Sequence, residues 1–519
     1  MKKDNSLLLG IDIGTTDTKC SVYDLRGNVI SNAMREYPMI LPQAGWVEED
    51  PEEWWNATKN CVHQCISSDS IANNIAAIGI SCTNSFIPVD KSGNALYNAI
   101  LQIDQRTTKE TEWILNNIGE EKIFDITCNR IARGTFSLPT LLWFKNNRPD
   151  IYSRTYKFLT PSGYIVQKLT NEYSISESRM CFTQLANTRT GKWDEDLIRI
   201  SGINKDLLPN PSKAYDIVGH VSSGAAHLTG LRIGTPVVGG AMDTVAAAVG
   251  AGAVKDGDIF LAVGTCGRFC YTSEKDVFNR SLMNCRNAFP GQWLSIGATN
   301  AAGASLRWFR DKFENEIMAF DLSTKSLYNN INKMAEEAPA GAGGLIYLPY
   351  LAGERYPIWN SDAKGVLLGL SLSTNISHIA RAIMEGVAFS LRQGMDIVRA
   401  NGLTDNSISM GGGIANSRIW CQIFADVFGH PIVKLPISET ETLGGAILAG
   451  YAVGLISNPG LFAKRIYDKG EIVEPDLTKK STYDDYYAIY NNASTSLEKV
   501  FSQMALVRSK EAEEGDYHS

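Results

Sequence analysis

The sequence predicts an α/β protein built from two similar halves, and three observations support this prediction. Residues 8–23 form an apolar run, a tight turn and a second alternating run, which is typical of two strands joined as a hairpin. Residues 259–272 repeat this arrangement. Apolar runs such as 75–82 predict buried strands, and segments such as 378–391 carry apolar residues at helical spacing. Two hairpins of one design, far apart in the chain, indicate a duplicated fold that holds one nucleotide between its halves; two unrelated hairpins are the alternative.

The bulk composition narrows the functional classes. The chain has 519 residues, 44% of them hydrophobic, and a formal net charge of −7. This balance argues against nucleic acid or an anionic membrane as the main partner. No apolar run reaches the length of a membrane span, so neither a signal peptide nor a membrane helix is expected. Ten scattered cysteines without a disulfide framework fit a reducing compartment, so we expect a cytoplasmic protein.

The first hairpin carries residues suited to binding a phosphate. Gly14 permits a tight turn, and Thr15 and Thr16 add hydroxyl groups beside backbone N–H donors. Lys19 lies next to this turn, and Asp12 precedes it. Such a concavity suits a phosphate, while the carboxylate suits the magnesium ion that accompanies it.

Two further segments contain candidate residues for a ligand site. Asn84 and Ser85 follow the predicted strand at 75–82, and ligands of α/β sheets gather beyond the carboxyl ends of strands. An ordinary polar loop is the alternative there. Residues 107–200 are predicted to be mainly helical and to form an insertion in the first half.

The triple glycine Gly411, Gly412 and Gly413 predicts a turn from a strand into a helix. Without β-carbons, such a turn lets a base or ribose approach the backbone, and the following helix adds partial positive charge. Asn416 and Ser417 are expected to begin this helix. A turn that only starts the helix is the alternative. Further helices are predicted at residues 442–454 and about 483–504.

Asp243 is the candidate general base. It follows the predicted strand at 236–240 and is expected in a loop before a helix of Ala and Val. Phosphoryl transfer needs a carboxylate that accepts the proton of the attacking hydroxyl. An N-cap is the alternative role for an Asp at this position, and both roles are compatible. Neither a Walker sequence nor a GxSxG motif occurs, so a P-loop kinase and a serine hydrolase lack support.

Nine blocks in this order resemble the FGGY carbohydrate kinases, especially their xylulokinase-like members. The blocks are GIDIGTTDTK, GWVEEDPEEWW, GAMDTVAAAVGAG, VGTCGRF, LPYLAGERYPIW, GVLLGLS, EGVAFSL, GGGIANSRIWCQIFADVFG and ETETLGGAILAG. The resemblance implies a two-domain actin/hexokinase-like fold, a duplicated ribonuclease H-like fold with an interdomain cleft. We expect a sugar-binding domain at 1–252, an ATP-binding domain at 253–480, and a helix with a polar tail at 481–519.

The resemblance also implies roles for individual residues. Asp12 and Asp243 would hold the metal, with Asp243 as the catalytic base. The implied ATP-binding residues are Gly14, Thr15, Thr16, Lys19, Gly264, Thr265, Gly411, Gly412, Gly413 and Asn416. The implied substrate-binding residues are Trp46, Asn84, Ser85, Asp104, Arg106, Met242 and Asp243.

The sequence departs from the family pattern near the expected acceptor pocket. Asn84 and Ser85 stand where xylulokinase-like members usually have Met-His and glycerol kinases Arg-Glu. Gln102 replaces the Trp of a Trp-x-Asp-x-Arg motif, Thr244 replaces a frequent Gln, and Thr140 stands where Lys is common. The motifs expected to bind ATP match the family pattern. The sequence therefore predicts the reaction more firmly than the identity of the acceptor.

We therefore predict an ATP- and magnesium-dependent kinase that phosphorylates a hydroxyl of a small sugar, with a pentulose such as xylulose as the leading candidate. The alternatives are a kinase for gluconate, a polyol or a signalling sugar, or a catalytically silent sugar or nucleotide sensor of the same fold. The expected partner is a small sugar, with neither nucleic acid nor membrane, and a homodimer is left open.

Overall fold

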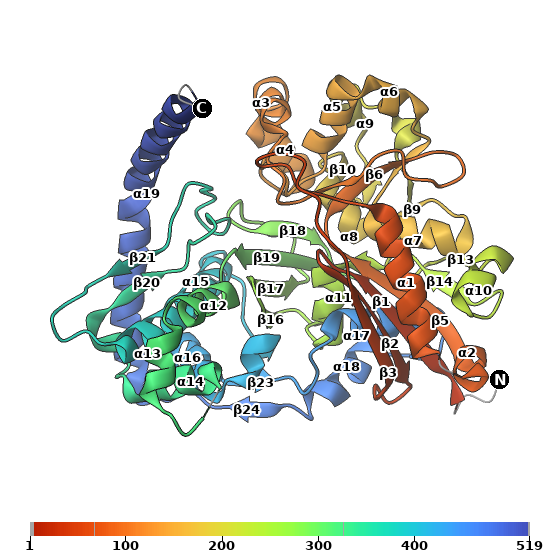
Figure 1. Ribbon diagram of the computed structural model, residues 1–519. Helices are drawn as coiled ribbons and strands as arrows, with labels where there is room; N and C mark the ends of the chain where they lie inside the picture. Colours follow the sequence, from red (N-terminus) through yellow and green to blue (C-terminus); the bar gives the residue numbers. More distant parts are fainter. Residues whose placement is uncertain (1–4, 67, 325, 517–519) are drawn as a thin grey trace. The chain divides into compact units, whose positions relative to one another are not determined.

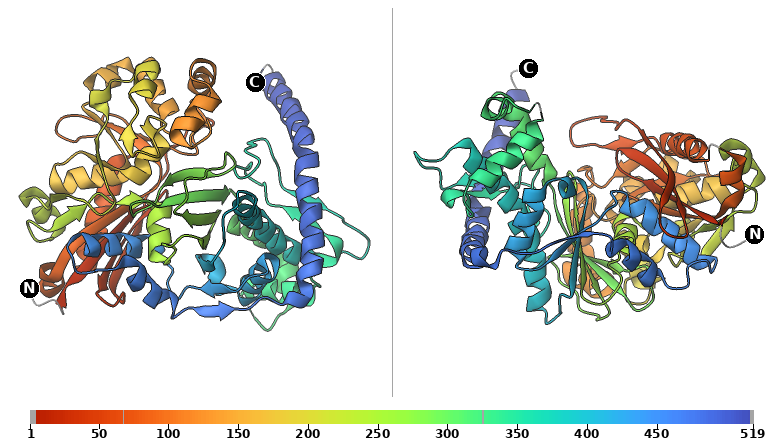
Figure 2. Two further views of the ribbon diagram at one scale, coloured as in Figure 1. Left: turned by 180° about the vertical axis from the view of Figure 1, so that it is seen from behind. Right: turned by 90° about the horizontal axis from the view of Figure 1, so that it is seen from below.

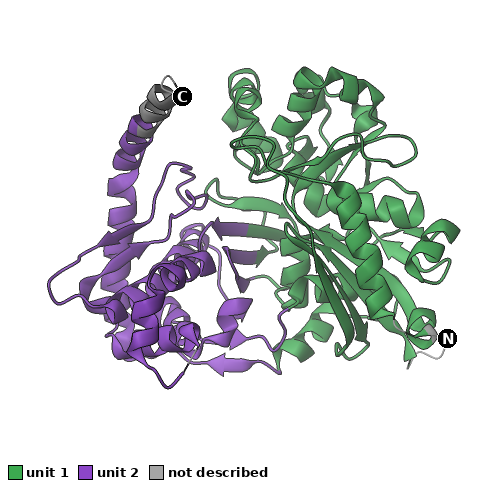
Figure 3. Cartoon of the chain, viewed as in Figure 1, with its two compact units in different colours: residues 1–256, 272–295, 439–468 green, residues 257–271, 296–438, 469–519 purple. Residues whose placement is uncertain are grey.

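The computed structural model describes residues 5–66, 68–324 and 326–516, and these form two compact units (Figure 3). Unit 1 comprises residues 1–256, 272–295 and 439–468, and unit 2 comprises residues 257–271, 296–438 and 469–519. The units interleave along the chain and do not test the continuous division expected from the sequence. The domain limits 1–252, 253–480 and 481–519 therefore stay a prediction.

Unit 1 is built on a mixed sheet whose central strands are predicted correctly. Among the described residues its order is β13-β14-β5-β1-β2-β3, and β15 also pairs with β5. The strands are β1 (Leu7–Ile13), β2 (Asp17–Asp24), β3 (Val29–Glu36), β5 (Ile75–Cys82), β13 (Ile217–His220), β14 (Pro236–Val238) and β15 (Ala241–Met242). Because β1, β5, β14 and β15 run parallel, their carboxyl ends lie at one edge of the sheet.

The predicted N-terminal hairpin is confirmed as β1 and β2. The two strands pair antiparallel, with Asp12 opposite Lys19. Between them the chain turns tightly, and the Gly14 N–H donates to the Asp17 carbonyl at 2.8 Å. The Tyr37 hydroxyl donates to the carbonyls of both Gly14 and Asp17, at 2.7 and 2.9 Å. This clamp holds the turn in one conformation.

Helices cover both faces of this sheet (Figures 1 and 2). Helix α1 (Pro51–Cys65) begins where the Asp50 side chain accepts a hydrogen bond from the Glu52 N–H. Its buried Trp54 and Cys61 pack in one core with Ile11 of β1.

Glycines allow a helix to approach the other face closely. A Cβ at Gly10 would lie 1.8 Å from the Thr442 carbonyl oxygen of α17 (Thr440–Ala452). A Cβ at Gly79 would lie 1.9 Å from the Gly445 carbonyl oxygen. Helix α11 (Asp243–Gly250) packs against α17 in the same way, since a Cβ at Gly444 would clash with α11. These contacts fix the first turns of α11 and α17 near the end of β1.

The remaining elements of unit 1 form a mainly helical insertion, as predicted for residues 107–200, and peripheral segments. A second, four-stranded sheet of the described chain has the order β4-β7-β6-β8. The helices are α2 (Asp69–Asn74), α3 (Thr108–Asn117), α4 (Glu120–Thr127), α5 (Leu138–Asn147), α6 (Pro149–Arg154), α7 (Pro161–Thr170), α8 (Glu177–Met180), α9 (Glu195–Ser201), α10 (Ser223–Thr229) and α18 (Pro459–Tyr467). The strands are β4 (Glu48–Glu49), β6 (Ser85–Val89), β7 (Ala99–Leu101), β8 (Lys157–Leu159), β9 (Ser174–Ser176), β10 (Ala186–Asn187), β11 (Lys192–Trp193), β12 (Asn210–Ser212) and β18 (Met283–Arg286).

Unit 2 contains the second predicted hairpin. Strands β16 (Asp258–Val263) and β17 (Gly267–Ser273) pair antiparallel, and β16 pairs parallel with β22 (Ser407–Gly411). The sheet continues through β23 (Ile432–Lys434) and β24 (Glu471–Val473). On its other side the same sheet continues from β17 to β19 (Trp293–Thr299), while β20 (Ile346–Leu348) and β21 (Val366–Leu368) form a separate two-stranded sheet. The parallel pair β16 and β22 brings two candidate nucleotide turns to one edge.

The helices of unit 2 match most predicted positions, although two are longer than predicted. They are α12 (Gly303–Lys312), α13 (Glu314–Phe320), α14 (Leu327–Glu337), α15 (Ile376–Ala400), α16 (Arg418–Phe428) and α19 (Lys480–Asp516). Helix α15 extends past the predicted 378–391, and α19 extends past 483–504. The extension of α15 still buries Gly394, Met395 and Val398, so the apolar stripe of this helix continues beyond the predicted range.

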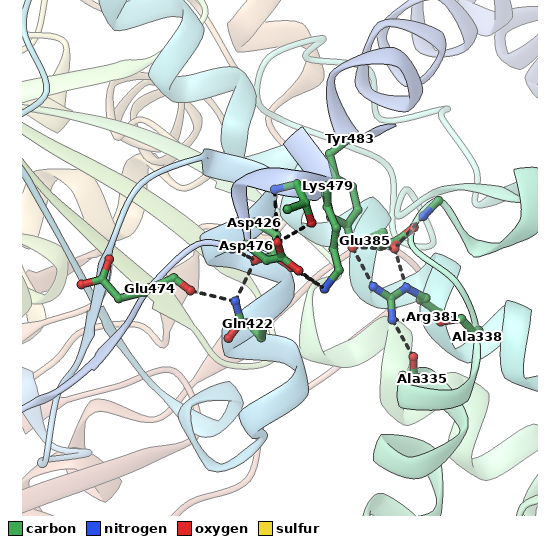
Figure 4. Close-up of polar contacts among 12 residues, drawn as sticks. Ala335, Ala338, Arg381, Glu385, Gln422, Asp426, Glu474, Asp476, Lys479 and Tyr483 are labelled. Atoms are coloured by element: carbon green, nitrogen blue, oxygen red, sulfur yellow. Dashed lines mark hydrogen bonds and ion pairs between the residues drawn. The ribbon is translucent and has the colours of Figure 1, made fainter. Parts of the chain in front are cut away.

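A buried polar network joins α15 to α19 (Figure 4). The Arg381 guanidinium donates to Glu385 Oε1 at 2.7 Å and to the Tyr483 hydroxyl at 2.8 Å. Tyr483 in turn donates to Glu385 Oε1 at 3.0 Å, and Arg381 also donates to the Ala335 carbonyl at 2.7 Å. Arg381 and Glu385 are 4% and 2% exposed, so water does not screen this pair.

Within residues 5–66, 68–324 and 326–516, no helix combines the length and apolar character needed to cross a membrane.

Candidate functional site

Three parallel strands of unit 1 bring distant candidate residues to one edge of the sheet. Ser81 of β5 lies opposite both Asp12 of β1 and Ala241 of β15. Asp243 follows β15 directly, and Asn84 lies two residues beyond the end of β5. This edge is where α/β sheets place their ligands.

Asp12 lies in a surrounding that opposes its negative charge. It is 6% exposed, and its Oδ1 accepts a hydrogen bond from Ser81 Oγ at 2.6 Å. Burial, followed by the charges of Glu441 and Asp243, raises the pKa of Asp12 to about 8, while Ser81 and Lys19 act in the opposite direction. The carboxylates of Glu441 on α17 and Asp243 on α11 thus add to the negative charge felt at Asp12, which a cation would offset.

Asp243 is the first residue of α11 and does not lie in a loop as predicted. Met242 is the N-cap, because the strand continues to that residue and the helix begins directly after it. The Asp243 Oδ1 accepts hydrogen bonds from the Thr244 N–H at 2.6 Å and the Thr244 hydroxyl at 3.0 Å. Thr244, one of the departures from the family pattern, thus fixes the orientation of this carboxylate.

Glu439 and Glu441 are acidic residues of this site that the sequence analysis did not single out. Glu439 Oε2 forms an ion pair with Lys19 Nζ at 3.1 Å, with both side chains about a third exposed. Burial lowers the pKa of Lys19, but Glu439 and further carboxylates outweigh this effect and raise it. Both residues belong to the sequence block ETETLGG, which the sequence analysis identified. Only the close packing of α17 on β1 shows that they lie near this edge of the sheet.

The turn residues of the first hairpin connect to the end of β5 and β7. Thr15 Oγ1 lies 3.2 Å from Thr83 Oγ1 and accepts a hydrogen bond from Gln102 Nε2 at 3.2 Å. Thr16 is exposed, and its hydroxyl donates to Asp17 at 3.2 Å. Gln102, another departure from the family pattern, therefore reaches the turn of the first hairpin.

Asn84 and Ser85 meet a residue that the sequence analysis missed. Asn84 Nδ2 donates to the Thr135 carbonyl, and Asn84 Oδ1 accepts a hydrogen bond from Arg179 Nη2. Arg179 is completely buried, and the charges acting on it include those of Cys82 and Asp243. Arg179 stands in a polar segment of the helical insertion, and the local sequence does not predict that it lies beside Asn84.

Trp46, Asp104 and Arg106 form a tightly paired group. The Arg106 guanidinium lies 3.7 Å from the centre of the Trp46 ring and donates to Asp104 at 2.9 and 2.7 Å and to Glu48 at 2.7 Å. Asp104 also accepts a hydrogen bond from the Val47 N–H at 2.6 Å. Burial lowers the pKa of Arg106, but Asp104 and Glu48 raise it by more. Asp104 and Arg106 thus orient the Trp46 ring. Contact of these three residues with the substrate stays a prediction.

In unit 2 the second hairpin turn rests on the start of α12. The Gly264 N–H donates to the Cys266 carbonyl at 3.0 Å, and the Gly303 N–H donates to the Gly264 carbonyl at 2.9 Å. The Ala304 N–H donates to the Thr265 carbonyl at 3.1 Å. A Cβ at Gly264 would meet nothing within 4 Å, so this side of the turn is open to a ligand.

The triple-glycine turn lies at the same edge of the sheet of unit 2. Gly411 of β22 pairs with Ala262, just before the hairpin turn. Gly412 has a φ of +95°, and a Cβ there would lie 2.6 Å from the Val263 carbonyl oxygen. Gly413 begins the short 3₁₀ helix η5 (Gly413–Asn416), and a Cβ there would meet nothing within 4 Å. Asn416 is exposed, and Ser417 is the N-cap of α16.

Glu354, from the GERYPIW block, supports the loop beneath this hairpin. It is 2% exposed and accepts hydrogen bonds from the Thr299 hydroxyl at 2.6 Å and the Asn300 N–H at 3.0 Å. Burial raises the pKa of Glu354 to about 7 despite these bonds. Cys266 Sγ in turn donates to the Asn300 carbonyl at 3.3 Å, which links Glu354 to the hairpin turn.

Comparisons with known proteins identify the family of this chain. The N-terminal domain of the FGGY family of carbohydrate kinases matches residues 7–250, and its C-terminal domain matches residues 260–453. The chain therefore belongs to the FGGY family and is a carbohydrate kinase, an enzyme class that uses ATP to phosphorylate sugars.

Individual relatives span nearly the whole chain. Xylulose kinase of Staphylococcus epidermidis is 32% identical over 93% of this chain and 95% of its own length. Gluconokinase of Bacillus subtilis is 30% identical over 96% of this chain and 98% of its own length. The crystal structure of xylulose kinase from Rhodospirillum rubrum superposes with a TM-score of 0.85, at 26% identity, and covers 96% of this chain and 100% of that one. The predicted family and the α/β fold class are thus confirmed.

Proposed function

We propose that this kinase phosphorylates a hydroxyl of a pentulose such as xylulose, with Asp243 as the general base. The observation that carries the proposal is that β1 and β15 both pair with β5, which places Asp12 and Asp243 at the same edge of the sheet. Resemblance to xylulose kinases over 93% of the chain supports the choice of acceptor.

Asp243 is suited to accept the proton of the attacking hydroxyl. Its carboxylate is held by the N–H and hydroxyl of Thr244, so it does not have to reorganise when the proton arrives. A positioned base of this kind contributes about 10²–10⁴-fold in rate. Transfer of the γ-phosphoryl group otherwise depends on positioning and on neutralising charge.

The carboxylates around Asp12 fit a magnesium ion. Mg²⁺ in kinases is held by one or two carboxylates together with the phosphates of the substrate. Burial, followed by the charges of Glu441 and Asp243, raises the pKa of Asp12, and the opposing effect of Lys19, which pairs with Glu439, is smaller. Asp12 and Asp243 would hold the ion, which neutralises phosphate charge when bound. The described part of the chain has no group of three or more His, Cys, Asp or Glu side chains that could hold a metal ion.

The nucleotide is proposed to bind through the two hairpin turns and the triple glycine. Backbone N–H groups and hydroxyls at Gly14, Thr15 and Thr16, with Lys19, suit phosphates in unit 1, and the turn at Gly264 and Thr265 suits phosphates in unit 2. Gly411, Gly412, Gly413 and Asn416 suit the adenosine, because the open side of Gly413 permits close approach. The acceptor would meet Trp46, Asn84, Ser85, Asp104, Arg106 and Met242.

The decisive test is ADP release with a panel of pentuloses, hexuloses, polyols and aldonates. Asp243→Asn should keep the fold and ATP binding, because the amide oxygen still accepts from Thr244, but lose at least about 10²-fold in sugar-dependent turnover. Asp196→Asn, at an exposed ion pair with Arg199, is the matched control and should keep normal activity. Near-normal turnover of Asp243→Asn would remove the base assignment, and sugar binding without turnover in the wild type would identify a sensor.

Two further features belong to the same proposal. All ten cysteines are present as thiols, and nine of them are buried, which fits work in a reducing cytoplasm. A homodimer is left open, and the mass of the protein in solution decides it.

A further inference from the structure

Arg179 is a buried cation beside the proposed acceptor residues. It lies on α8 (Glu177–Met180), and no part of its side chain is exposed. Its Nη2 donates to Asn84 Oδ1, and its surroundings include the charge of Asp243. The neighbouring Ser178 hydroxyl accepts a hydrogen bond from the Met242 N–H at 3.1 Å, which fixes α8 against the residue before the proposed base.

Two donors of Arg179 lack a hydrogen-bond partner within the described residues. These are Nε and Nη1, and both are buried. Folded proteins leave few such groups, and each one calls for an explanation. Burying a charged donor without a hydrogen-bond partner costs much free energy. A ligand that pairs with Arg179 binds more tightly for this reason, because the guanidinium is already removed from water and held in place.

Other unpartnered polar atoms lie in the same neighbourhood. Ser85 Oγ and Gln102 Oε1 are also buried without a hydrogen-bond partner in the part of the chain that the structure describes. Ser85 pairs with Leu101 in the sheet, so Gln102 follows directly beside it. Asn84 connects this pair to Arg179 through its amide. The group therefore offers a hydroxyl, an acceptor and a fixed cationic donor to one ligand.

The chemistry of these groups limits the ligand. Hydroxyl groups of a sugar both donate and accept, so Ser85, Gln102 and Asn84 can satisfy them. A guanidinium only donates, and it favours an oxygen that carries no proton and holds negative or partial negative charge. In an open-chain ketose such an oxygen is the ketone carbonyl, in an aldonate it is the carboxylate, and a pentitol has none.

We propose that Arg179 is a specificity-determining residue that donates to the proton-free oxygen of the acceptor, a ketone carbonyl or a carboxylate, and so selects ketoses or aldonates over polyols. This inference rests on the proposed function of the same site. Asn84 and Gln102 are the half-buried members of the group, and the Asn84 amide bonds the guanidinium, so this amide has to turn for the ligand oxygen to reach Arg179.

The test compares three acceptors of equal chain length: a 2-pentulose, the matching aldonate and the matching pentitol. Arg179→Met should lower kcat/KM about 10- to 100-fold for whichever of the first two is the substrate, because a charged hydrogen bond is lost. The pentitol should change little, and the KM for ATP should stay constant. Arg179→Lys keeps a donor and should restore part of the discrimination. Comparing kcat/KM for the pentulose and the aldonate shows whether Arg179 binds a ketone carbonyl or a carboxylate.

Arg286→Met is the matched control. Arg286 donates to Glu177 Oε2 at 2.6 Å on the same short helix, but it is partly exposed and pairs with carbonyls as well. Its loss should affect stability without changing the ratio of kcat/KM between the three acceptors. This separates a role in supporting α8 from a role in choosing the acceptor.

An equal loss for all three acceptors, or no loss for any, would overturn the inference. If Arg179→Met does not fold, the ratio measured with Arg179→Lys decides, and an unchanged ratio overturns it as well. Calorimetric binding of the same three sugars gives this ratio without turnover. Absence of any sugar-dependent ADP release would therefore defeat the proposed function, whereas an unchanged binding preference would defeat only the role of Arg179.

Discussion

Glu49 carries a buried carboxyl group whose ionisation the fold opposes, so Glu49→Gln should change how stability depends on pH. The side chain is 1% exposed, and its Oε2 accepts a hydrogen bond from Trp54 Nε1 at 2.8 Å. Its Oε1 has no hydrogen-bond partner among the described residues. Burial raises the pKa of Glu49 from its usual 4.5 to about 8, although the bond from Trp54 acts in the opposite direction.

The sign and size of the effect follow from proton linkage. Between pH 4.5 and about 8 the folded protein binds more protons at Glu49 than the unfolded chain does. The free energy of unfolding is therefore highest below pH 4.5 as far as this group is concerned, and it falls as the pH rises toward 8. A difference of about 3.5 pKa units, at about 1.4 kcal/mol each, corresponds to roughly 5 kcal/mol above pH 8. Glu49→Gln removes this slope.

Urea unfolding followed by circular dichroism at about pH 5.5, 7 and 8.5 measures this slope. The stability of Glu49→Gln relative to wild type should rise by about 1.4 kcal/mol for each pH unit up to about pH 8 and level off above it. A constant offset from the new amide does not affect this readout. A difference that stays the same at all three pH values would refute the reasoning.

Glu48→Gln is the matched control for the adjacent residue. Glu48 is also buried, but it accepts hydrogen bonds from Arg106 at 2.7 Å and from Asn98 at 2.9 Å. Loss of its charge should destabilise the protein by about 1.5–3 kcal/mol, because Arg106 loses a charged partner. The two variants should therefore change stability in opposite directions at about pH 8.5.

Two further predictions concern unit 2. Gly412→Ala should destabilise the protein by at least about 1–3 kcal/mol in urea unfolding, because φ is +95° and the new Cβ would clash with backbone. Gly413→Ala meets open space and should keep stability but raise the KM for ATP; an unchanged KM would argue against nucleotide approach at this turn. Arg381→Met should cost about 3–5 kcal/mol because Glu385 stays buried without its cation, while Arg399→Met, at a half-exposed pair, should cost about 1 kcal/mol or less. Equal costs for these two would contradict the role of burial.

The local features of the fold were predictable from the sequence. The hairpin at residues 8–23 and the turn at 411–413 were predicted correctly because apolar alternation and glycine restrict the backbone within a few residues. The end of β15 was not predicted correctly, since its pairing with β5 extends the strand to Met242 and makes Asp243 the first helical residue.

The residues that complete the site depended on packing between distant segments. Glu441 lies near Asp12 only because glycines let α17 approach the sheet closely, and neither segment shows this by itself. Arg179 stands in a polar stretch of the insertion, where an exposed arginine is the ordinary expectation. Its burial beside Asn84 depends on how α8 packs against β15.

The sequence by itself determined the family, the two hairpins and the acidic residue that serves as proposed base, because these depend on short patterns whose conformations are restricted locally. Only the tertiary structure decided which carboxylates repel Asp12 and which arginine donates a hydrogen bond to Asn84. Electrostatic interactions and desolvation depend on distances through space and on burial, and neither quantity is encoded at any one position of the chain.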